Sequence, residues 1–206
     1  MQHHPELDRW IIDAVGRKTG SVLDLGCGIG RNGYLMWERG MAPRRVGIEV
    51  DQCYLEKALE LGVYERVEQA DLSRGIPEDD KSFDVVLCTQ VIALMKKSAG
   101  VRLLDDCERV AVQRVVLTVQ VGTPQLEVRP NPHESDRSQW TAGELRERGY
   151  SVRGFGSRLS RNIHGGRRFL YGFYVGTLLA QLSTRYAEEV LAVRELSPPP
   201  PETGGA

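Results

Sequence analysis

Cysteine and histidine are scarce in this sequence, with four of each among 206 residues. The cysteines show no metal-ligand spacing, and they fall where strands, helices or a turn are predicted, which favours reduced thiols and a cytoplasmic location. The sequence also lacks an apolar run long enough to span a bilayer, and its start lacks a basic stretch followed by an apolar one. We therefore expect no membrane span, no signal peptide and no metal.

An excess of charge is also missing, since the net charge is -1, with 41% hydrophobic and 27% charged residues. This composition is ordinary for a soluble globular protein, and the length suggests one domain. From Gly149 to Ala187, however, there is no Asp, Glu or Lys, while arginine occurs six times. This segment either faces an anionic partner or forms a solvated surface that pairs with acids elsewhere.

Glycine is plentiful, and it recurs at every second position after the apolar stretch Val22–Leu25. The pattern predicts a buried strand, a tight turn and the start of a helix. Glycines allow a ligand to approach the backbone, and a helix start offers unpaired N–H groups, so the turn suits a nucleotide-like cofactor. Gly28 to Gly33 also fits the dinucleotide pattern G-x-G-x-x-G, but the strand ends at Leu25 and carries Asp24, which favours a frame of Gly26, Gly28 and Gly30.

Asp24 followed by this G-x-G-x-G frame resembles motif I of the class I S-adenosylmethionine-dependent methyltransferases. Glu49 follows about 20 residues beyond the glycines, where a carboxylate can bind ribose hydroxyls, although a strand-end acid or helix cap is the alternative. Asp71 resembles the family's acid near the adenine amino group, and Phe83–Val86 resembles the start of its fourth strand. The resemblance implies S-adenosylmethionine as cofactor, S-adenosylhomocysteine as product, and these cofactor-binding residues: Asp24, Gly26, Cys27, Gly28, Gly30, Glu49, Val50, Asp71, Leu72, Cys88 and Thr89.

Strands and helices alternate along the first two thirds, which predicts an α/β doubly wound, mostly parallel sheet with helices on both faces. The resemblance implies a Rossmann-like sheet of seven strands with the last antiparallel. We expect one domain over residues 1–196, with an N-terminal helix within 1–17, substrate-side loops and helices over 122–186, and a disordered Pro-rich tail over 197–206. In the last third, helices are predicted at Ser138–Arg148, capped by Ser138, and at Leu170–Tyr186, with strands at Tyr150–Phe155 and Glu189–Arg194.

The residues after the fourth strand bear on the substrate, because the reactive methyl lies near there in this family. Thr89-Gln90-Val91-Ile92 lacks the Asn/Asp-Pro-Pro-aromatic signature of amino methylation on adenine or glutamine, and the sequence lacks a Pro-Cys pair. His133, in a late loop, is the candidate catalytic base, with a surface histidine as the alternative. The candidate substrate-binding residues, for which surface or core roles are the alternatives, are Trp10, Gln90, His164, Arg167 and Arg168.

The sequence thus predicts a methyltransferase that acts on an oxygen or nitrogen of a small molecule, with anionic or carboxylate-bearing acceptors among the candidates. RNA or protein methylation is an alternative that the late arginines favour and the near-neutral charge opposes. A nicotinamide oxidoreductase is opposed by Asp24 and Phe83–Val86. A catalytically silent cofactor-binding protein stays open, because methyl transfer requires no universal catalytic residue. We expect a small-molecule partner rather than nucleic acid or membrane, and a monomer or homodimer.

Overall fold

The structure is a computed structural model, and it describes residues 5–121, 131–156 and 176–196. The predicted tail and most of the two predicted late loops lie outside these residues. Among the described residues, no helix is both long enough and apolar enough to cross a membrane.

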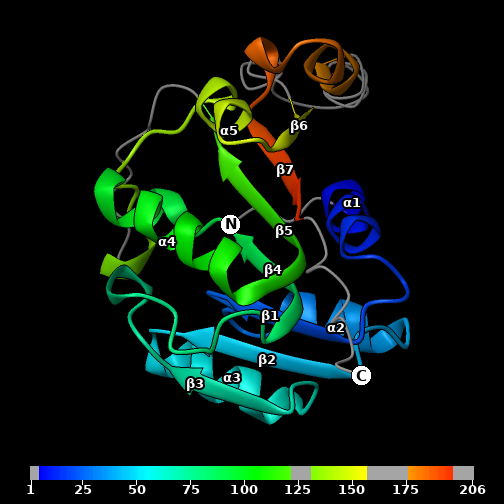
Figure 1. Cartoon of the computed structure of the whole chain (residues 1–206), viewed down its shortest axis with the longest axis vertical. Coiled ribbons are helices and arrows are strands. Elements are labelled where there is room, and N and C mark those ends of the chain that lie inside the picture. The colour runs from blue at the N-terminus through cyan, green and yellow to red at the C-terminus, as the bar shows by residue number, and fades with distance from the viewer. Residues whose placement is uncertain (1–4, 122–130, 157–175, 197–206) are drawn as a thin grey trace, which may run out of the picture.

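A seven-stranded sheet forms the centre of the fold, in the order β3-β2-β1-β4-β5-β7-β6 (Figure 1). The five strands from β3 to β5 run parallel, whereas β7 is antiparallel to both of its neighbours. This confirms the predicted α/β sheet of seven mostly parallel strands with the last one antiparallel. The strand bounds are β1 Ser21–Leu25, β2 Arg44–Glu49, β3 Arg66–Gln69, β4 Phe83–Thr89, β5 Ala111–Gln120, β6 Ser151–Phe155 and β7 Glu189–Glu195.

Helices cover both faces of this sheet because its strands alternate apolar side chains between two cores. Val22, Val85 and Val116 face the core under α1 and α2, while Leu23, Val86 and Val115 face the core under α4. A layer of helices on each face is therefore expected, because the central strands are apolar on both sides. The helices are α1 Pro5–Val15, α2 Arg31–Glu38, α3 Gln52–Leu61, α4 Lys97–Val110 and α5 Ala142–Glu147, and residues 176–182 are also helical.

The predicted start of the helix before β6 is wrong: α5 begins at Ala142, and its cap is Thr141 rather than Ser138. The Thr141 Oγ1 accepts a hydrogen bond from the Glu144 backbone at 3.2 Å, and the Glu144 carboxylate accepts one from the Thr141 backbone at 2.8 Å. This reciprocal pair is a capping box, which satisfies two backbone donors where a single hydroxyl satisfies one. Ser138 instead bonds to the Ile92 carbonyl, so it anchors the segment before the helix.

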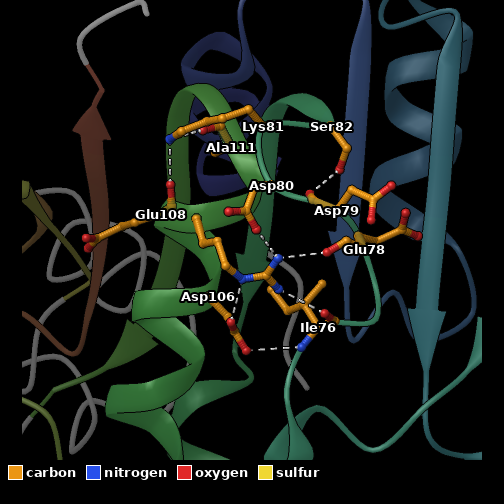
Figure 2. A network of polar contacts seen from close by, with 10 residues as sticks. Ile76, Glu78, Asp79, Asp80, Lys81, Ser82, Asp106, Glu108 and Ala111 are labelled. Carbon is orange, nitrogen blue, oxygen red and sulfur yellow. Dashed lines mark hydrogen bonds and ion pairs between the residues drawn. The ribbon is translucent and has the colours of Figure 1, made fainter.

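At the edge of the sheet where β4 begins, residues 76–82 are fastened to the end of α4 (Figure 2). The Arg109 guanidinium donates to the carbonyl oxygens of Ile76 and Glu78 at 3.0 and 2.8 Å, and it pairs with two carboxylates, those of Asp80 and Asp106. Asp106 also accepts from the Ile76 backbone at 3.2 Å. The Arg109 side chain thus supplies hydrogen bonds to the polar groups of residues 76–82, at the edge of the sheet opposite the glycine turn.

We expect R109A to lower the free energy of unfolding by about 2–3 kcal/mol, because it removes several charged hydrogen bonds from one partly buried group. Urea unfolding measures this change. The matched control is R9A: the Arg9 side chain is 80% exposed and, among the described residues, pairs only with Asp13, at 3.6 Å. Its effect should therefore stay below about 0.5 kcal/mol. Equal stability of the two variants would show that Arg109 does not hold this connection.

Candidate functional site

The predicted cofactor residues gather where the parallel strands end. The glycine turn follows β1, Glu49 is the last residue of β2, and Thr89 is the last residue of β4. Strand β1 lies between β2 and β4, and the chain winds away from it in both directions. The carboxyl ends of β1 and β4 therefore form the topological switch point at which open α/β sheets bind their ligands.

The three glycines of the turn all have positive φ, but they serve different purposes. A Cβ on Gly26 would lie 2.5 Å from Val91, so this position needs glycine for packing. A Cβ on Gly28, where φ is +56°, would meet no atom within 4 Å. Gly28 therefore leaves open space beside the backbone, which is the room that an approaching ligand requires.

The Cys27 side chain points away from this open space, into the sheet. A Cβ on Gly47 of β2 would lie 2.8 Å from the Cys27 sulfur, so the thiol packs where Gly47 lacks a side chain. Burial raises the pKa of this thiol, and the charges of Asp24 and Glu49 raise it further. Cys88, also in the predicted set, is fully buried within β4. Any contact of these two residues with a ligand would thus come from the backbone.

Glu49 ties the glycine turn to the end of β2, and only 6% of it is exposed. One carboxylate oxygen accepts from the Gly28 backbone at 2.8 Å, and the other accepts from the Val50 and Asp51 backbones at 2.8 and 2.9 Å. Three N–H donors compensate the charge of this carboxylate, and no basic side chain of residues 5–121, 131–156 or 176–196 pairs with it. The oxygen that accepts only from Gly28 retains a lone-pair site for a further donor such as a ribose hydroxyl.

Asp24 is fully buried below the turn, and it links β1 to α2 and to the residues before β3. The Tyr64 hydroxyl donates to the Asp24 carboxylate at 2.7 Å, and the Asn32 side-chain amide donates to it at 3.5 Å. The same Asn32 amide donates to the Thr89 hydroxyl at 3.0 Å. Burial raises the pKa of Asp24 to about 7, and the charge of Glu49 adds to this rise, while the hydrogen bonds from Tyr64 and Asn32 oppose it. The acid therefore holds the base of the turn to its neighbours.

Sequence reasoning missed both partners of Asp24. Asn32 lies within the glycine stretch, where its amide could have been recognised as a partner for a buried acid. Tyr64 carries no local signal, because it lies 40 residues away and reaches Asp24 only in the fold.

Beyond β3, Asp71 lies exposed and caps the 3₁₀ turn Leu72–Arg74, in which Leu72 is buried. Hydrogen bonds from Ser73 lower the pKa of Asp71, and the charges of Arg74 and His133 lower it further. The Val50 carbonyl accepts from Gln69 at 3.1 Å, so the ends of β2 and β3 are held together. Asp71 is thus available on the same side of the glycine turn as Glu49.

Residues 131–138 cross this edge of the sheet. Asn131 donates to Asp51 at 2.8 Å, Tyr54 donates to Glu134, and the Arg137 backbone donates to the Ala93 carbonyl at 2.7 Å. The segment therefore spans from the start of α3 to the turn after β4. His133 lies on it, exposed and close to Asp51 and Asp71, so it stands on the β2–β3 side. Its predicted catalytic role stays a prediction.

On the other side of the switch point, Gln90 directly follows β4 in a left-handed conformation with φ +60°. Its amide donates to the Thr118 hydroxyl at 3.2 Å and to the carboxylate of Glu189. Sequence reasoning missed Glu189, although a glutamate at the head of an apolar strand was visible. Trp10 on α1 contacts Phe155 edge-on at 5.4 Å, with the Arg153 guanidinium 3.4 Å from its ring centre.

Three predicted substrate residues, His164, Arg167 and Arg168, lie outside the described residues. Within the described ranges, no cluster of three or more His, Cys, Asp or Glu side chains could hold a metal ion.

Comparison with known proteins agrees with this geometry. Residues 22–113, just under half of the chain, match the family model of a methyltransferase domain. No curated protein matches the sequence. Similar solved structures include YcgJ from Bacillus subtilis (16% identity, 96% of this chain and 100% of that one, TM-score 0.61) and a SAM-dependent methyltransferase from Archaeoglobus fulgidus (14%, 93% and 93%, 0.60). The [4+2]-cyclase SpnF is also similar (20%, 93% and 81%, 0.57).

The sheet and its glycine turn define a Rossmann-like fold of the class I methyltransferase type. Residues 22–113 match a methyltransferase domain and the solved structures share the fold, in agreement with the resemblance to the class I S-adenosylmethionine-dependent methyltransferases.

Proposed function

We propose that this protein is a methyltransferase that uses S-adenosylmethionine to methylate an oxygen or nitrogen of a small molecule. The observation that carries the proposal is the hydrogen bond from the Gly28 backbone to the Glu49 carboxylate. It places a buried carboxylate beside the open space at Gly28, at the switch point of the sheet. A carboxylate there suits vicinal ribose hydroxyls, and the open space suits a nucleoside lying over the turn.

The residues present fit this cofactor. Gly28 leaves room for it, Glu49 would accept from the ribose, and Asp71 with Leu72 would bind the adenine. When bound, the cofactor supplies a methyl group on a sulfonium, activated for in-line displacement. The contribution of the chain is then mainly orientation, because aligned and close reactants lower the barrier by themselves.

The methyl acceptor is expected to bind on the side of the glycine turn where Gln90 lies. Glu49, Asp71 and residues 131–134 occupy the β2–β3 side of the turn, so the ends of β4, β5 and β7 are left for the acceptor. The arginines behind the expectation of an anionic acceptor lie mostly outside the described residues. RNA or protein methylation therefore finds no specific support in the described part of the structure.

Cofactor binding by two glycine variants tests the proposal. We expect G28V to weaken S-adenosylmethionine binding at least about 30-fold, or about 2 kcal/mol, because its side chain would fill the open space. The matched control is G40V: Gly40 also has positive φ, +62°, and open surroundings, but it lies in the turn after α2, away from the site. Isothermal titration calorimetry measures both dissociation constants.

The same titration with NAD and NADP decides between cofactors. Binding of a dinucleotide but not of S-adenosylmethionine would overturn the proposal, because it would mean that the glycines serve the other frame. Equal losses in G28V and G40V would show that backbone strain, rather than a filled binding space, causes the effect.

A further inference from the structure

Polar side chains form a band across four adjacent strands, at the edge of the sheet where the parallel strands have their carboxyl ends. Val22, Leu87, Val116 and Leu191 all belong to the core under α1 and α2. Side chains two residues apart on a strand share a face, so the residues at this edge face the same layer. The band consists of Asp24 on β1, Thr89 on β4, Thr118 on β5 and Glu189 on β7.

Glu189 reaches this band because β7 is antiparallel. Its first residue therefore lies beside the last residues of β5, with Glu189 opposite Gln120. Gln90 donates to the Glu189 carboxylate and to Thr118, and Thr118 also bonds to Glu189. Gln90 holds this position in a backbone conformation that costs a residue other than glycine about 1 kcal/mol. Strain of this kind clusters where a site fixes a side chain.

No cationic side chain among the described residues pairs with Glu189. Its two hydrogen-bond partners are neutral, and its other neighbours Glu188 and Asp8 are acids. Of the basic groups on this side, Arg31 pairs with Asp8, and the Arg153 guanidinium lies over the Trp10 ring of α1. Burial raises the pKa of Glu189 to about 7, against the hydrogen bonds from Gln90 and Thr118, and the charges of Glu188 and Asp8 raise it further.

Glu189 is half-buried, and no cation of the described residues pairs with it. Such a carboxylate is costly, and the cost falls when a cation binds beside it. Glu189 lies on the side of the turn that Glu49 and Asp71 leave for the acceptor. We propose that Glu189 binds a protonated amine of the methyl acceptor and takes its proton, so that this site methylates an amine nitrogen. This inference rests on the proposed function and narrows its substrate class.

The proposed step balances. The ammonium group of the acceptor gives one proton to the Glu189 carboxylate, which frees the nitrogen lone pair. The nitrogen then forms a bond to the methyl carbon while the carbon–sulfur bond breaks, and that electron pair stays on sulfur. The products are S-adenosylhomocysteine and a methylated ammonium ion, with a protonated Glu189 that later releases its proton to water.

The acceptor class is tested with the full-length protein and S-adenosylmethionine carrying a tritiated methyl group. Small molecules extracted from the producing organism are separated on cation and anion exchangers, and each fraction is assayed for labelled product. We expect label only in molecules that the cation exchanger retains. Label confined to the anionic or neutral fraction would overturn the inference but keep the proposed function. No label in any fraction, with the cofactor still bound, would contradict the proposed function itself.

Variants at Glu189 give readouts beyond activity. With the active fraction, E189Q should transfer methyl at least about 100-fold more slowly, as expected for loss of a proton acceptor, with unchanged cofactor affinity. The wild-type rate should rise with pH through about 7, and E189Q should lose this rise. The matched control is E195Q, at the exposed far end of the same strand, where Glu195 pairs with Arg114 at 3.2 Å. Its rate and pH profile should stay unchanged.

The neighbours of Glu189 provide a second, independent variant in case E189Q does not fold. The acids near Glu189 are Asp8 from α1 and Glu188 just before β7. The cations on this side are Arg31, which pairs with Asp8, and Arg153 of β6, which lies over the Trp10 ring. Because the charge of Asp8 raises the pKa of Glu189, D8N should move the midpoint of the pH profile to lower pH. A midpoint unmoved by D8N, or a wild-type profile in E189Q, would overturn the role of Glu189.

Discussion

E49Q is expected to weaken S-adenosylmethionine binding at least about 100-fold, which corresponds to about 2.7 kcal/mol. The Glu49 carboxylate accepts from three backbone N–H groups at 2.8 to 2.9 Å, those of Gly28, Val50 and Asp51. In the variant, the amide nitrogen must face at least one of these donors, so a buried N–H loses its acceptor and the turn shifts. The ribose loses its proposed acceptor at the same time. Isothermal titration calorimetry measures the dissociation constant.

E65Q is the matched control for E49Q. It makes the same change of charge at an exposed glutamate just before β3, whose backbone N–H donates to the Arg45 carbonyl. We expect its cofactor affinity to stay within about twofold of the wild type. If E49Q bound the cofactor as tightly as E65Q does, Glu49 would be only a structural tie between the turn and β2, and the proposed ribose contact would be wrong.

The half of the site built from β1 and β2 is predictable from sequence because its signals are local. A strand, a glycine turn and a helix start follow one another without interruption at Val22–Gly33, and backbone sterics restrict what such a turn can do. Glu49 is equally visible, because a parallel neighbour strand places its last residue next to the turn. The parallel order of the first five strands follows from the same alternation.

The other half of the site depends on contacts between distant residues. Whether Glu189 meets Gln90 is decided by the position of β7 between β5 and β6 and by its antiparallel register. The alternation of strands and helices does not specify that register, so a glutamate at the head of a late strand looks like a surface acid. Tyr64 and Asp24 are a second case, since no periodicity relates a turn before β3 to the middle of β1.

The predicted start of α5 was wrong because two residues near it can each cap a helix. Both Ser138 and Thr141 can cap a helix, but only Thr141 has a glutamate three residues later that completes the reciprocal bond. Ser138 was left for the Ile92 carbonyl, to which the Trp140 indole N–H also donates, at 3.2 Å. The capping box thus marks where α5 begins, while the Ile92 carbonyl holds Ser138 and Trp140 in the segment before it.

Replacement of Asp24 by asparagine should make stability less dependent on pH. The pKa of Asp24 is raised from 3.8 to about 7 in the fold, chiefly by burial. Between these values the unfolded chain has lost a proton that the folded chain retains, so the free energy of unfolding falls as pH rises through that window. About three pKa units correspond to about 4 kcal/mol. The asparagine side chain would mimic the protonated acid, and it does not titrate.

We therefore expect the stability of D24N relative to the wild type to rise by up to about 4 kcal/mol from pH 4 to pH 8, as measured by urea unfolding at several pH values. D79N, at an exposed aspartate in the connection before β4, should show a much smaller change with pH. A difference between D24N and the wild type that is constant across this range would show that Asp24 is ionised in the fold. In that case Tyr64 and Asn32 would have to compensate a full buried charge, and the base of the glycine turn would be an anionic rather than a neutral network.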